Sequence, residues 1–338
     1  MTRKVKLAVI GTGRMGSVHA RNIVRQIPEA ELVAVCDIRR DVAQAVASEL
    51  GIERVVEDYH ELLSDKDIEA ILVVSSTDTH AFIMKDVAAA GKHIFCEKPL
   101  ALDLDKIDDA LAAVKAAGVK LQVGFNRRFD KSYQRVRAIV ESGEIGRPCI
   151  LKITNRDPDF PSMDFLRVSG GIFLDLAIHD FDMVRFQVGE VEEIYATGNV
   201  LINQELKEFG DIDTAVVTLK FANGAVGSID NSRKAVYGYD QRLEVFCSNG
   251  TAMANNEAET TAVKGNTDGF LSAKPPYFFM QRYAPCYVEE IRRFVECVRD
   301  DKPTPTTGED GRAAVVLGFA AWKSLRENRP VRLSEFKK

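Results

Sequence analysis

The chain has 338 residues, of which 46% are hydrophobic and 28% charged, and its formal net charge is −5. This length predicts two domains or one large one, and the composition is typical of a soluble globular protein that can bury a sizeable core. The mildly acidic charge, without a basic excess, argues against nucleic acid as a main partner. No apolar run approaches the roughly 18 residues of a membrane helix, and the N-terminus runs directly into a predicted strand. We therefore expect neither a membrane span nor a signal peptide.

Six cysteines are scattered along the chain without a Cys-x-x-Cys pair. Scattered thiols in a chain without a secretion signal are typical of reduced, mostly buried residues in a cytosolic protein. We therefore expect a cytoplasmic protein with neither a zinc site nor a disulfide framework. The cysteines are Cys36, Cys96, Cys149, Cys247, Cys286 and Cys297.

A glycine-rich turn follows the first apolar run. Residues 5–10 lead into Gly11-Thr12-Gly13-Arg14-Met15-Gly16, and a helical pattern opens at once. This order of strand, tight turn and helix is the context in which Gly-x-Gly-x-x-Gly indicates dinucleotide binding. Gly11 can adopt the backbone angles of the turn, Gly13 lets a pyrophosphate approach the main chain, and Gly16 lets the helix pack closely on the strand. The free N–H groups at the helix start then face the phosphates.

An acidic residue stands at the end of the second predicted strand. Residues 31–36 form this apolar strand and end in Asp37, about 20 residues after Gly16. A carboxylate there can accept hydrogen bonds from both hydroxyls of the adenosine ribose and repels a 2′-phosphate, which predicts NAD rather than NADP. Arg39 and Arg40 could each meet a phosphate, so NADP stays possible as a minor cofactor.

Strand and helix patterns alternate up to about Gly124. Six strands with intervening helices predict a doubly wound parallel sheet, a Rossmann domain over residues 1–124 with its ligand at the carboxyl ends of the strands. The further strands are expected at 54–56, 70–75, 93–96 and 120–123, and the helices at 15–26, 41–50, 59–63, 80–90 and 104–117.

Polar segments follow the fourth, fifth and sixth strands. The segment after the fourth strand, residues 75–80, is suited to holding ribose hydroxyls or to capping the next helix, and these two roles are compatible. Because loops at the carboxyl ends converge on one crevice, we expect Lys98 and one of the arginines to lie near the nicotinamide. The segments are Ser75-Ser76-Thr77-Asp78-Thr79-His80, Glu97-Lys98-Pro99 and Gly124-Phe125-Asn126-Arg127-Arg128-Phe129-Asp130.

Beyond residue 147 the pattern changes to strands with hairpin turn signals at Asn223-Gly224 and Asn249-Gly250. This predicts a C-terminal α+β domain, residues 125–338, with a large open, mostly antiparallel sheet. One face of such a sheet needs a further cover, often a second subunit, so we expect a homo-oligomer. The last helix can pack back on the N-terminal domain. Strands are expected at 150–155, 193–201, 214–221, 225–231 and 242–246, and helices at 171–188, 285–299 and 310–327.

The predicted helix over 171–188 carries Asp175 and His179 at i and i+4, with Asp182 one turn on. Ionisable residues among apolar neighbours carry a desolvation cost unless they pair or serve a site. A helix-surface Asp–His pair is the alternative. The preceding double glycine allows close backbone approach or mobility near the cofactor cleft. Alcohol oxidation needs a base for the hydroxyl proton, and histidine is well matched to that near neutral pH.

Four segments together resemble the Gfo/Idh/MocA oxidoreductase family, and the resemblance runs nearly the whole length of the chain. It implies a Rossmann domain, a C-terminal α/β domain with an open sheet and usually a tetramer. The combination is far more specific than any single motif. The segments are the glycine motif, Glu97-Lys98-Pro99, Gly124-Phe125-Asn126-Arg127-Arg128-Phe129-Asp130 and Gly170-Gly171-Ile172-Phe173-Leu174-Asp175 with His179-Asp180.

By this resemblance the catalytic residues are Lys98, Asp175 and His179. His179 takes the proton from the reacting hydroxyl and Asp175 orients it, while Lys98 holds the same oxygen and stabilises the negative charge developing there. Since Lys98 supplies the positive charge, no metal is needed. Outside the family, Lys98 would be interpreted as a solvated loop residue.

The same resemblance implies two further sets of contacts. For Tyr239 and Tyr283, aromatic packing is the alternative to a substrate contact. The cofactor contacts are Gly11, Gly13, Arg14, Met15, Gly16, Asp37, Ile38, Ser75, Thr77, His80, Glu97 and Asn126. The substrate contacts are Lys98, Arg127, Asn155, Asp157, Asp175, His179, Tyr239 and Tyr283.

The polarity of this predicted site suits a polyhydroxylated ring. The similarity is greatest to family members that oxidise inositol, particularly over 155–158 and 237–242. It implies NAD-dependent oxidation of a secondary hydroxyl of myo-inositol to the 2-keto product. Scyllo-inositol or a pyranose such as glucose stays open as the substrate. A non-catalytic NAD-binding sensor is a third hypothesis, against which the intact lysine, acid and base argue.

Overall fold

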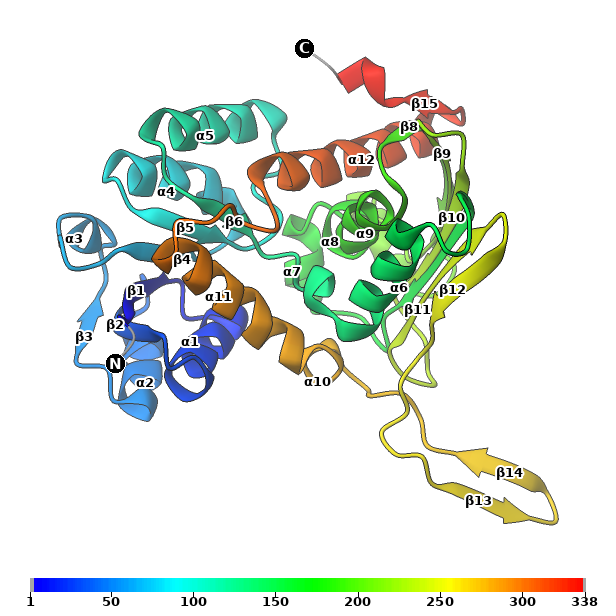
Figure 1. The fold of residues 1–338 in the computed structure, drawn as a ribbon, viewed down its shortest axis with the longest axis horizontal. Coiled ribbons are helices and arrows are strands. Elements are labelled where there is room, and N and C mark those ends of the chain that lie inside the picture. The colour runs from blue at the N-terminus through cyan, green and yellow to red at the C-terminus, as the bar shows by residue number, and fades with distance from the viewer. Residues whose placement is uncertain (1–2, 337–338) are drawn as a thin grey trace. The chain divides into compact units, whose positions relative to one another are not determined.

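A computed structural model describes residues 3–336 and divides the chain into two compact units (Figure 1). The first unit combines the chain up to Phe129 with Pro285–Ala313, and the second combines Asp130–Ala284 with the chain from Ala314 onward. The single domain boundary expected after residue 124 stays a prediction.

The first unit is built on a six-stranded, all-parallel sheet in the order β3-β2-β1-β4-β5-β6. This is the doubly wound order of a Rossmann fold, which confirms the predicted fold class. Every residue of the central strand β4 is buried, as expected for a parallel strand covered on both faces. The strands are β1 (Val5–Ile10), β2 (Ala30–Cys36), β3 (Arg54–Val56), β4 (Ala70–Val73), β5 (His93–Cys96) and β6 (Leu121–Val123).

The helices of this unit include one from much later in the chain. Helix α11 (Ala284–Arg299) contributes Ile291, Phe294 and Val295 to the hydrophobic cluster that contains β1 and β2. Since a fully buried side chain of this size contributes about 1.5–3 kcal/mol, these residues hold α11 firmly on the Rossmann core. The remaining helices are α1 (Arg14–Gln26), α2 (Arg40–Leu50), α3 (His60–Leu63), α4 (Thr77–Ala89), α5 (Leu104–Ala117) and the 3₁₀ turn η1 (Asn126–Phe129).

The second unit contains a seven-stranded sheet in the order β12-β11-β7-β10-β9-β8-β15. Only the β7–β10 pair is parallel among these neighbours, so the predicted mostly antiparallel sheet is confirmed. Buried and exposed residues alternate along β9, which leaves one face of the sheet open. The strands are β7 (Pro148–Arg156), β8 (Val191–Asn199), β9 (Thr214–Phe221), β10 (Val226–Ser232), β11 (Asp240–Cys247), β12 (Gly250–Ala254) and β15 (Val331–Arg332).

Helices cover the other face of this sheet, and a hairpin projects away from it (Figure 1). The hairpin of β13 (Val263–Asn266) and β14 (Gly269–Ser272) has no buried residue. Neither it nor α6 was among the sequence predictions. The helices and turns are α6 (Lys131–Ser142), α7 (Met163–Val168), α8 (Ile172–Asp175), α9 (Ile178–Val188), α10 (Phe279–Arg282), α12 (Gly308–Glu327), η2 (Gln204–Phe209) and η3 (Leu333–Phe336).

The single helix predicted over 171–188 is wrong, because α8 and α9 are separated at Leu176 and Ala177. The Ala177 N–H bonds to the Ile172 carbonyl oxygen at 2.8 Å, a wider turn than an α-helix makes. The helix α9 is also not amphipathic, since its buried residues include Asp180, Asp182 and Gln187. Asp180 accepts hydrogen bonds from Asn155 on β7 and Asn231 on β10, whereas Gln187 donates to the Tyr133 carbonyl oxygen on α6. The buried side of α9 is therefore partly polar, which the apolar pattern did not reveal.

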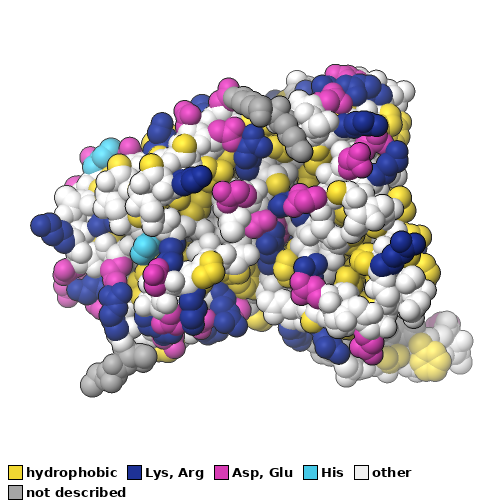
Figure 2. Space-filling model, turned by 45° about the horizontal axis from the view of Figure 1, so that its top comes forward, with side chains coloured by type: hydrophobic (Ala, Val, Ile, Leu, Met, Phe, Trp, Pro, Cys, Tyr) yellow, Lys and Arg dark blue, Asp and Glu magenta, His cyan; other side chains and the backbone are white. Residues whose placement is uncertain are grey.

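Three further observations complete the fold. All six cysteines, each in the described part of the chain, are free thiols, and five are buried. Between residues 3 and 336, no helix has the length and apolar character to cross a membrane. On the face drawn in Figure 2, basic and acidic side chains are intermixed, in keeping with the small net charge.

Candidate active site

The glycine turn after β1 has two positions that protein contacts reserve for glycine. A Cβ on Gly11, whose φ is +90°, would lie 2.6 Å from the backbone of Ser75, and a Cβ on Gly16 would lie 1.8 Å from the Gly11 carbonyl oxygen. Gly13 differs, because no described atom lies within 4 Å of where its Cβ would be. The protein itself thus gives no reason for glycine at 13, whereas a pyrophosphate approaching the start of α1 does. The turn fits a dinucleotide.

Asp37 is held directly beside this turn. Its Oδ2 accepts hydrogen bonds from the Thr12 N–H at 2.8 Å and the Thr12 hydroxyl at 3.0 Å, and its Oδ1 accepts one from the Arg39 N–H at 3.0 Å. Each carboxylate oxygen has more than one lone pair, so these contacts orient the group and leave acceptor capacity for ribose hydroxyls. The neighbouring Ile38 has a side chain that is 88% exposed. An oriented acid and an exposed apolar surface therefore lie next to the glycine turn.

The residues predicted after β4 are only partly in a loop. Helix α4 begins at Thr77, three residues before the predicted start, so Thr77 and His80 lie in its first turns. The His80 ring is buried, and its nitrogens contact the carbonyl oxygens of Pro99 at 2.9 Å and Ser75 at 3.0 Å. Burial lowers the pKa of His80. His80 therefore links the loop after β4 to the loop after β5.

Glu97 and Lys98 follow β5, and Glu97 is fixed from several sides. Its Oε1 lies 2.8 Å from the His19 Nε2, and its Oε2 accepts a hydrogen bond from the Lys98 N–H at 3.2 Å. A Cβ on Gly124 would lie 2.9 Å from Oε2, so the carboxylate packs directly on that glycine. Nearby in sequence, Asn126 and Arg127 are both buried in η1. The first unit thus gathers the glycine turn, Asp37, Ser75 and Lys98 at the carboxyl ends of the neighbouring strands β2, β1, β4 and β5.

In the second unit, Asp175 ends α8 and is held by a buried arginine that the sequence interpretation missed. The Arg233 side chain, 0% exposed, donates from Nη1 to Asp175 Oδ2 at 3.0 Å and from Nη2 to Asp211 Oδ2 at 3.2 Å. Burial works to lower the pKa of Arg233, but Asp175 and Asp211 outweigh it and the pKa is raised. Burial also disfavours the charged form of Asp211 and raises its pKa, and the attraction of Arg233 works against that rise. Arg233 is thus a doubly paired buried cation that orients Asp175.

The double glycine before α8 also has a structural explanation. A Cβ on Gly171, whose φ is +79°, would lie 2.8 Å from Asp211 Oδ1 and 2.5 Å from the Trp322 ring. Asp211 Oδ1 accepts the Ile172 N–H at 2.9 Å, the first free donor of α8. The glycine therefore permits close approach between the start of α8 and Asp211. The role predicted for it near the cofactor cleft stays a prediction.

Asn155, predicted to contact substrate, lies 0% exposed in a buried polar network. Its Nδ2 donates to Asp180 Oδ2 at 2.7 Å, its Oδ1 accepts from Gln241 at 2.5 Å, and Asn231 also donates to Asp180 at 2.8 Å. Tyr283, 1% exposed, donates to Gln241 at 3.4 Å. These contacts fit a positioning role for Asn155 and Tyr283.

Tyr239 packs against Tyr283, and Asp157 lies directly after β7. The rings of Tyr239 and Tyr283 pack edge to face, with centroids 6.0 Å apart, which is the aromatic packing kept open as the alternative. The Asp157 main chain bonds to Ser232, the last residue of β10, and to Ala235 in the loop that follows. His179 and Asp157 are both partly exposed.

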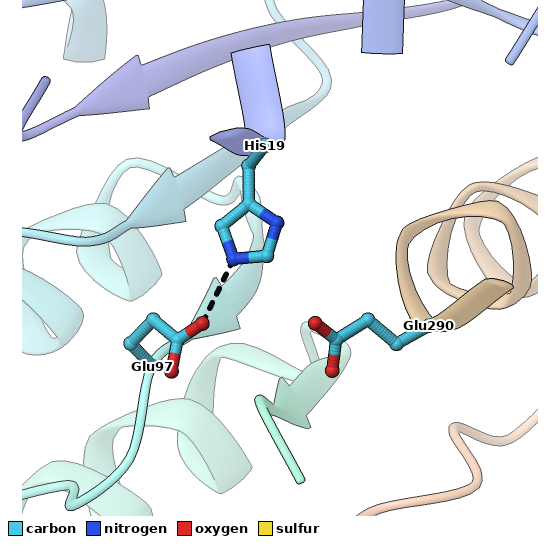
Figure 3. A group of neighbouring side chains, drawn as sticks. All are labelled: His19, Glu97 and Glu290. Carbon is cyan, nitrogen blue, oxygen red and sulfur yellow. Dashed lines mark hydrogen bonds and ion pairs between the residues drawn. The ribbon is translucent and has the colours of Figure 1, made fainter. Parts of the chain in front are cut away.

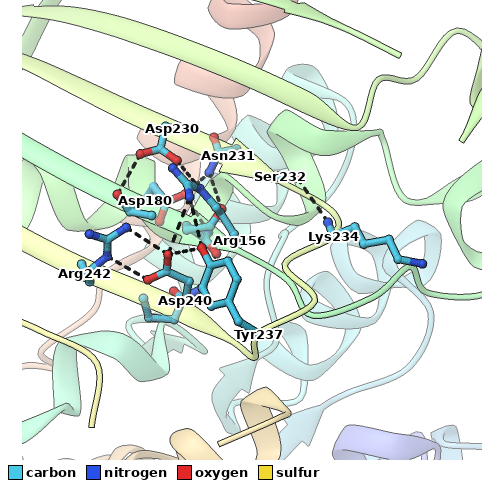
Figure 4. A network of polar contacts seen from close by, with 12 residues as sticks. Arg156, Asp180, Asp230, Asn231, Ser232, Lys234, Tyr237, Asp240 and Arg242 are labelled. Atoms are coloured by element: carbon cyan, nitrogen blue, oxygen red, sulfur yellow. Dashed lines mark hydrogen bonds and ion pairs between the residues drawn. The ribbon is translucent and has the colours of Figure 1, made fainter. Parts of the chain in front are cut away.

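On the open face of the sheet, Arg156 forms the centre of a second ion network (Figure 4). Arg156 Nε lies 2.6 Å from Asp230 Oδ1, and Tyr237 donates to Asp240 at 2.6 Å while accepting from Arg156 at 3.1 Å. Arg242 also pairs with Asp240. Tyr237, Asp240 and Arg242 are thus joined to one another and to Arg156, whereas Gln241 points to Asn155.

A parallel sheet of this order, with a glycine turn for a pyrophosphate and an acid after the second strand, defines a dinucleotide-binding protein. Residues 5–125 match the model described as "Oxidoreductase family, NAD-binding Rossmann fold", and residues 133–253 match the Gfo/Idh/MocA C-terminal domain. The chain belongs to the Gfo/Idh/MocA oxidoreductase family, and its cofactor is NAD.

Relatives of known activity extend over almost the whole chain. The myo-inositol 2-dehydrogenase of Thermotoga maritima is 48% identical, over 98% of this chain and 99% of its own. The scyllo-inositol 2-dehydrogenase (NAD(+)) of Bacillus subtilis is 38% identical, over 98% of this chain and 97% of its own. The crystal structure of myo-inositol dehydrogenase from Lactobacillus casei with NAD(H) and myo-inositol superposes with a TM-score of 0.89 at 28% identity, covering 97% of this chain and 96% of that one.

Proposed function

We propose that this enzyme is an NAD-dependent inositol 2-dehydrogenase that oxidises a secondary hydroxyl of myo-inositol to the 2-keto product. The observation that carries the proposal is the near full-length similarity to the Thermotoga maritima myo-inositol 2-dehydrogenase. The proposal assigns charge stabilisation to Lys98, orientation to Asp175 and the role of base to His179. The non-catalytic sensor hypothesis does not account for these three residues.

The residues that hold NAD in this proposal are those of the first unit. Gly13 and the first N–H groups of α1 receive the pyrophosphate, and Asp37 accepts hydrogen bonds from the ribose hydroxyls. The exposed Ile38 side chain would offer an apolar surface to the adenine ring. When bound, NAD⁺ supplies the hydride acceptor, C4 of its nicotinamide ring.

The proposed chemistry of the protein's own residues is proton transfer and charge stabilisation. His179 accepts the proton of the reacting hydroxyl, and Asp175, oriented by Arg233 at 3.0 Å, orients His179. Lys98 donates a hydrogen bond to the same hydroxyl oxygen and stabilises its developing negative charge. Arg127 and Asp157 contact the other hydroxyls of the ring, while Asn155 holds the sheet side of the site through Asp180.

Scyllo-inositol is the second candidate substrate, since the Bacillus subtilis relative that oxidises it is 38% identical over nearly the whole chain. The two isomers differ in the orientation of one hydroxyl. A site lined by neutral and charged hydrogen-bonding groups discriminates them by which hydroxyl is left unpaired.

We also propose that the enzyme is a homotetramer that buries the open face of the second unit's sheet. Ile150, Val226 and Phe246 are cross-strand neighbours on this face, and their side chains are 38–46% exposed. A contiguous exposed apolar row of this kind marks an interaction surface. A cytoplasmic location stays a prediction.

The test is NADH formation, followed by absorbance, with a panel of inositols and pyranoses. We expect the highest kcat/KM with myo-inositol and NAD⁺. Turnover of a pyranose with none of any inositol would refute the substrate assignment. Absence of turnover with every polyol, together with tight NAD binding, would support the sensor hypothesis instead.

A further inference from the structure

Each unit contains a cluster of buried polar side chains, and the two clusters differ in how they are bonded. In the first unit, His19 and Glu97 contact each other at 2.8 Å, and Figure 3 shows the Glu290 carboxyl group directed at both. Neither carboxyl oxygen of Glu290 has a hydrogen-bond partner within residues 3–336, and burial raises its pKa well above the ordinary value, which favours the neutral acid. The Glu290 side chain therefore holds no residue of the predicted site in place.

In the second unit, the buried Asn155 amide is hydrogen-bonded on both sides of the break between α8 and α9. Its Nδ2 group donates to the Leu176 carbonyl oxygen at 3.3 Å and to Asp180 Oδ2 at 2.7 Å. An amide nitrogen carries two hydrogens, so these two contacts use both of its donors. Its Oδ1 accepts from Gln241 at 2.5 Å. Asn155, which is 0% exposed, thus directs its donors at the protein itself.

The break lies between the two residues of the second unit that are assigned to proton transfer. Asp175 ends α8, and His179 is the second residue of α9. The N–H groups of Leu176 and Ala177 both bond to the Ile172 carbonyl oxygen, at 3.1 and 2.8 Å, so the turn closed by Ala177 has one residue more than an α-helical turn. Because an α-helix has about 3.6 residues per turn, one extra residue rotates every side chain beyond it by roughly 100°. The break therefore sets the direction of His179 relative to Asp175.

Asp180, which directly follows His179, attaches the start of α9 to the sheet. Asp180 is 0% exposed, and its Oδ2 accepts a second hydrogen bond from Asn231 Nδ2 at 2.8 Å (Figure 4). Asn155 on β7 and Asn231 on β10 are register partners on adjacent parallel strands. Two amides side by side in the sheet thus bind one carboxylate oxygen, and the Asn155 amide also reaches the break.

We propose that Asn155 is a positioning residue for the dehydrogenase reaction, which sets the direction of His179 by bonding to the Leu176 carbonyl oxygen and to Asp180 at once. The inference rests on the proposed function, because it concerns the residue assigned as the base. Asn231 provides a matched comparison. It donates to Asp180 and to the Asn155 carbonyl oxygen, so a change at 231 weakens the hold on Asp180 and leaves the bond to Leu176 in place.

A direct hydrogen bond from Asn155 to a ring hydroxyl of the substrate is the competing explanation. Loss of a contact that substrate and transition state share raises KM and leaves kcat unchanged. Misplacement of the base instead lowers kcat, because the reacting groups must be held within a narrow range of distance and orientation. The division of the effect between KM and kcat therefore separates the two explanations.

The experiment compares Asn155→Leu with Asn231→Leu, since leucine keeps the branching of asparagine at Cγ and removes its donors. At saturating NAD⁺ and myo-inositol, we expect Asn155→Leu to lower kcat by about tenfold or more, because misplacement by about 1 Å can cost on the order of 100-fold. The KM for myo-inositol and the NAD dissociation constant should stay near the wild-type values. Asn231→Leu should keep most of the turnover. Thermal unfolding above the assay temperature verifies that each variant is folded.

A second variant, Asn155→Ser, keeps the test available if leucine at this position prevents folding. A hydroxyl carries one hydrogen, so serine cannot hold the Leu176 carbonyl oxygen and Asp180 at once. We expect this variant also to lower kcat with a near wild-type KM.

Hydrogen–deuterium exchange over residues 172–182 is a measurement that does not require turnover. Exchange there should be faster in Asn155→Leu than in the wild type or Asn231→Leu, because the break loses its bond to the sheet. A raised KM with wild-type kcat would overturn the positioning role in favour of a substrate contact. Wild-type kcat in Asn155→Leu, or equal losses of kcat in the two leucine variants, would overturn the role of the bond to the break. Failure of the wild type to oxidise any inositol would instead refute the proposed function, and the exchange rates would still test whether Asn155 holds the break.

Discussion

The NAD-binding turn of the first unit and the Arg233 network of the second unit are built in opposite ways. The glycine turn is assembled within consecutive residues, from Gly11 to Gly16. The network joins Asp175, Asp211 and Arg233 across separations of 58 and 22 positions. A local motif can be detected in one sequence because its spacing is set by the geometry of a turn. A network of buried charges has no such spacing and becomes visible only in the folded chain.

The largest effect is expected from removing Arg233, the cation at the centre of the second unit's network. Arg233→Met leaves Asp211 buried without its partner, and breaking a buried pair in this way costs about 3–5 kcal/mol. Urea unfolding measures this loss. The control Arg156→Met, whose pair with Asp230 is about one-third exposed, should cost at most about 1 kcal/mol. Equal losses in the two variants would contradict the special role of Arg233.

Glu290, a buried acid on α11 of the first unit, should make the stability of the protein depend on pH. The pKa of Glu290 is raised in the folded protein, so its contribution to stability is complete only below the ordinary value of about 4.5. Above that pH the unfolded chain releases a proton that the folded chain keeps, so stability falls by about 1.4 kcal/mol per pH unit until the folded group titrates. The free energy of unfolding of Glu290→Gln minus that of the wild type should therefore rise with pH. A difference independent of pH would show that Glu290 is not a buried neutral acid.

Two glycines of the NAD-binding turn should respond differently to alanine. Gly16→Ala forces a Cβ against the Gly11 carbonyl oxygen and should destabilise the fold by about 1–3 kcal/mol. Gly13→Ala meets no described protein atom, so its stability should be near wild type while NAD affinity falls. Calorimetry and NAD titration separate the two effects. If Gly13→Ala bound NAD normally, the pyrophosphate would not lie against that residue.

The smallest change concerns cofactor choice. Asp37→Ser removes the charge that repels a 2′-phosphate and the acceptor for the ribose hydroxyls, so the preference for NAD over NADP should relax by about tenfold, or about 1.4 kcal/mol. Steady-state kcat/KM with each cofactor measures it. A wild type that already prefers NADP would show that Asp37 has been misassigned.

The sequence predicted the doubly wound parallel sheet and the mostly antiparallel second sheet because both depend on short-range periodicity. It failed at 171–188, where neither proline nor glycine marks the break at Leu176 and Ala177. The burial of residues on β7 could be predicted in part from the sequence, since Asn155 continues the inward alternation of Leu151 and Ile153. That alternation predicts an inward-facing amide, although not its partners.

His19 and Glu290 show the same limit within the first unit. His19 lies on the buried face of α1 with Ala20 and Ile23, where an isolated histidine among apolar residues was the available signal. Glu290 is far away in sequence and comes back to the Rossmann core only because α11 packs there. A sequence pattern cannot report a contact that depends on this return of the chain.

The central claim, that this family member oxidises inositol with His179 as the base, is tested most directly by the turnover of His179→Ala with myo-inositol and saturating NAD⁺. Loss of the general base should lower kcat by roughly 100-fold or more while NAD affinity stays near that of the wild type. An unchanged kcat would remove His179 as the base and contradict the proposed chemistry.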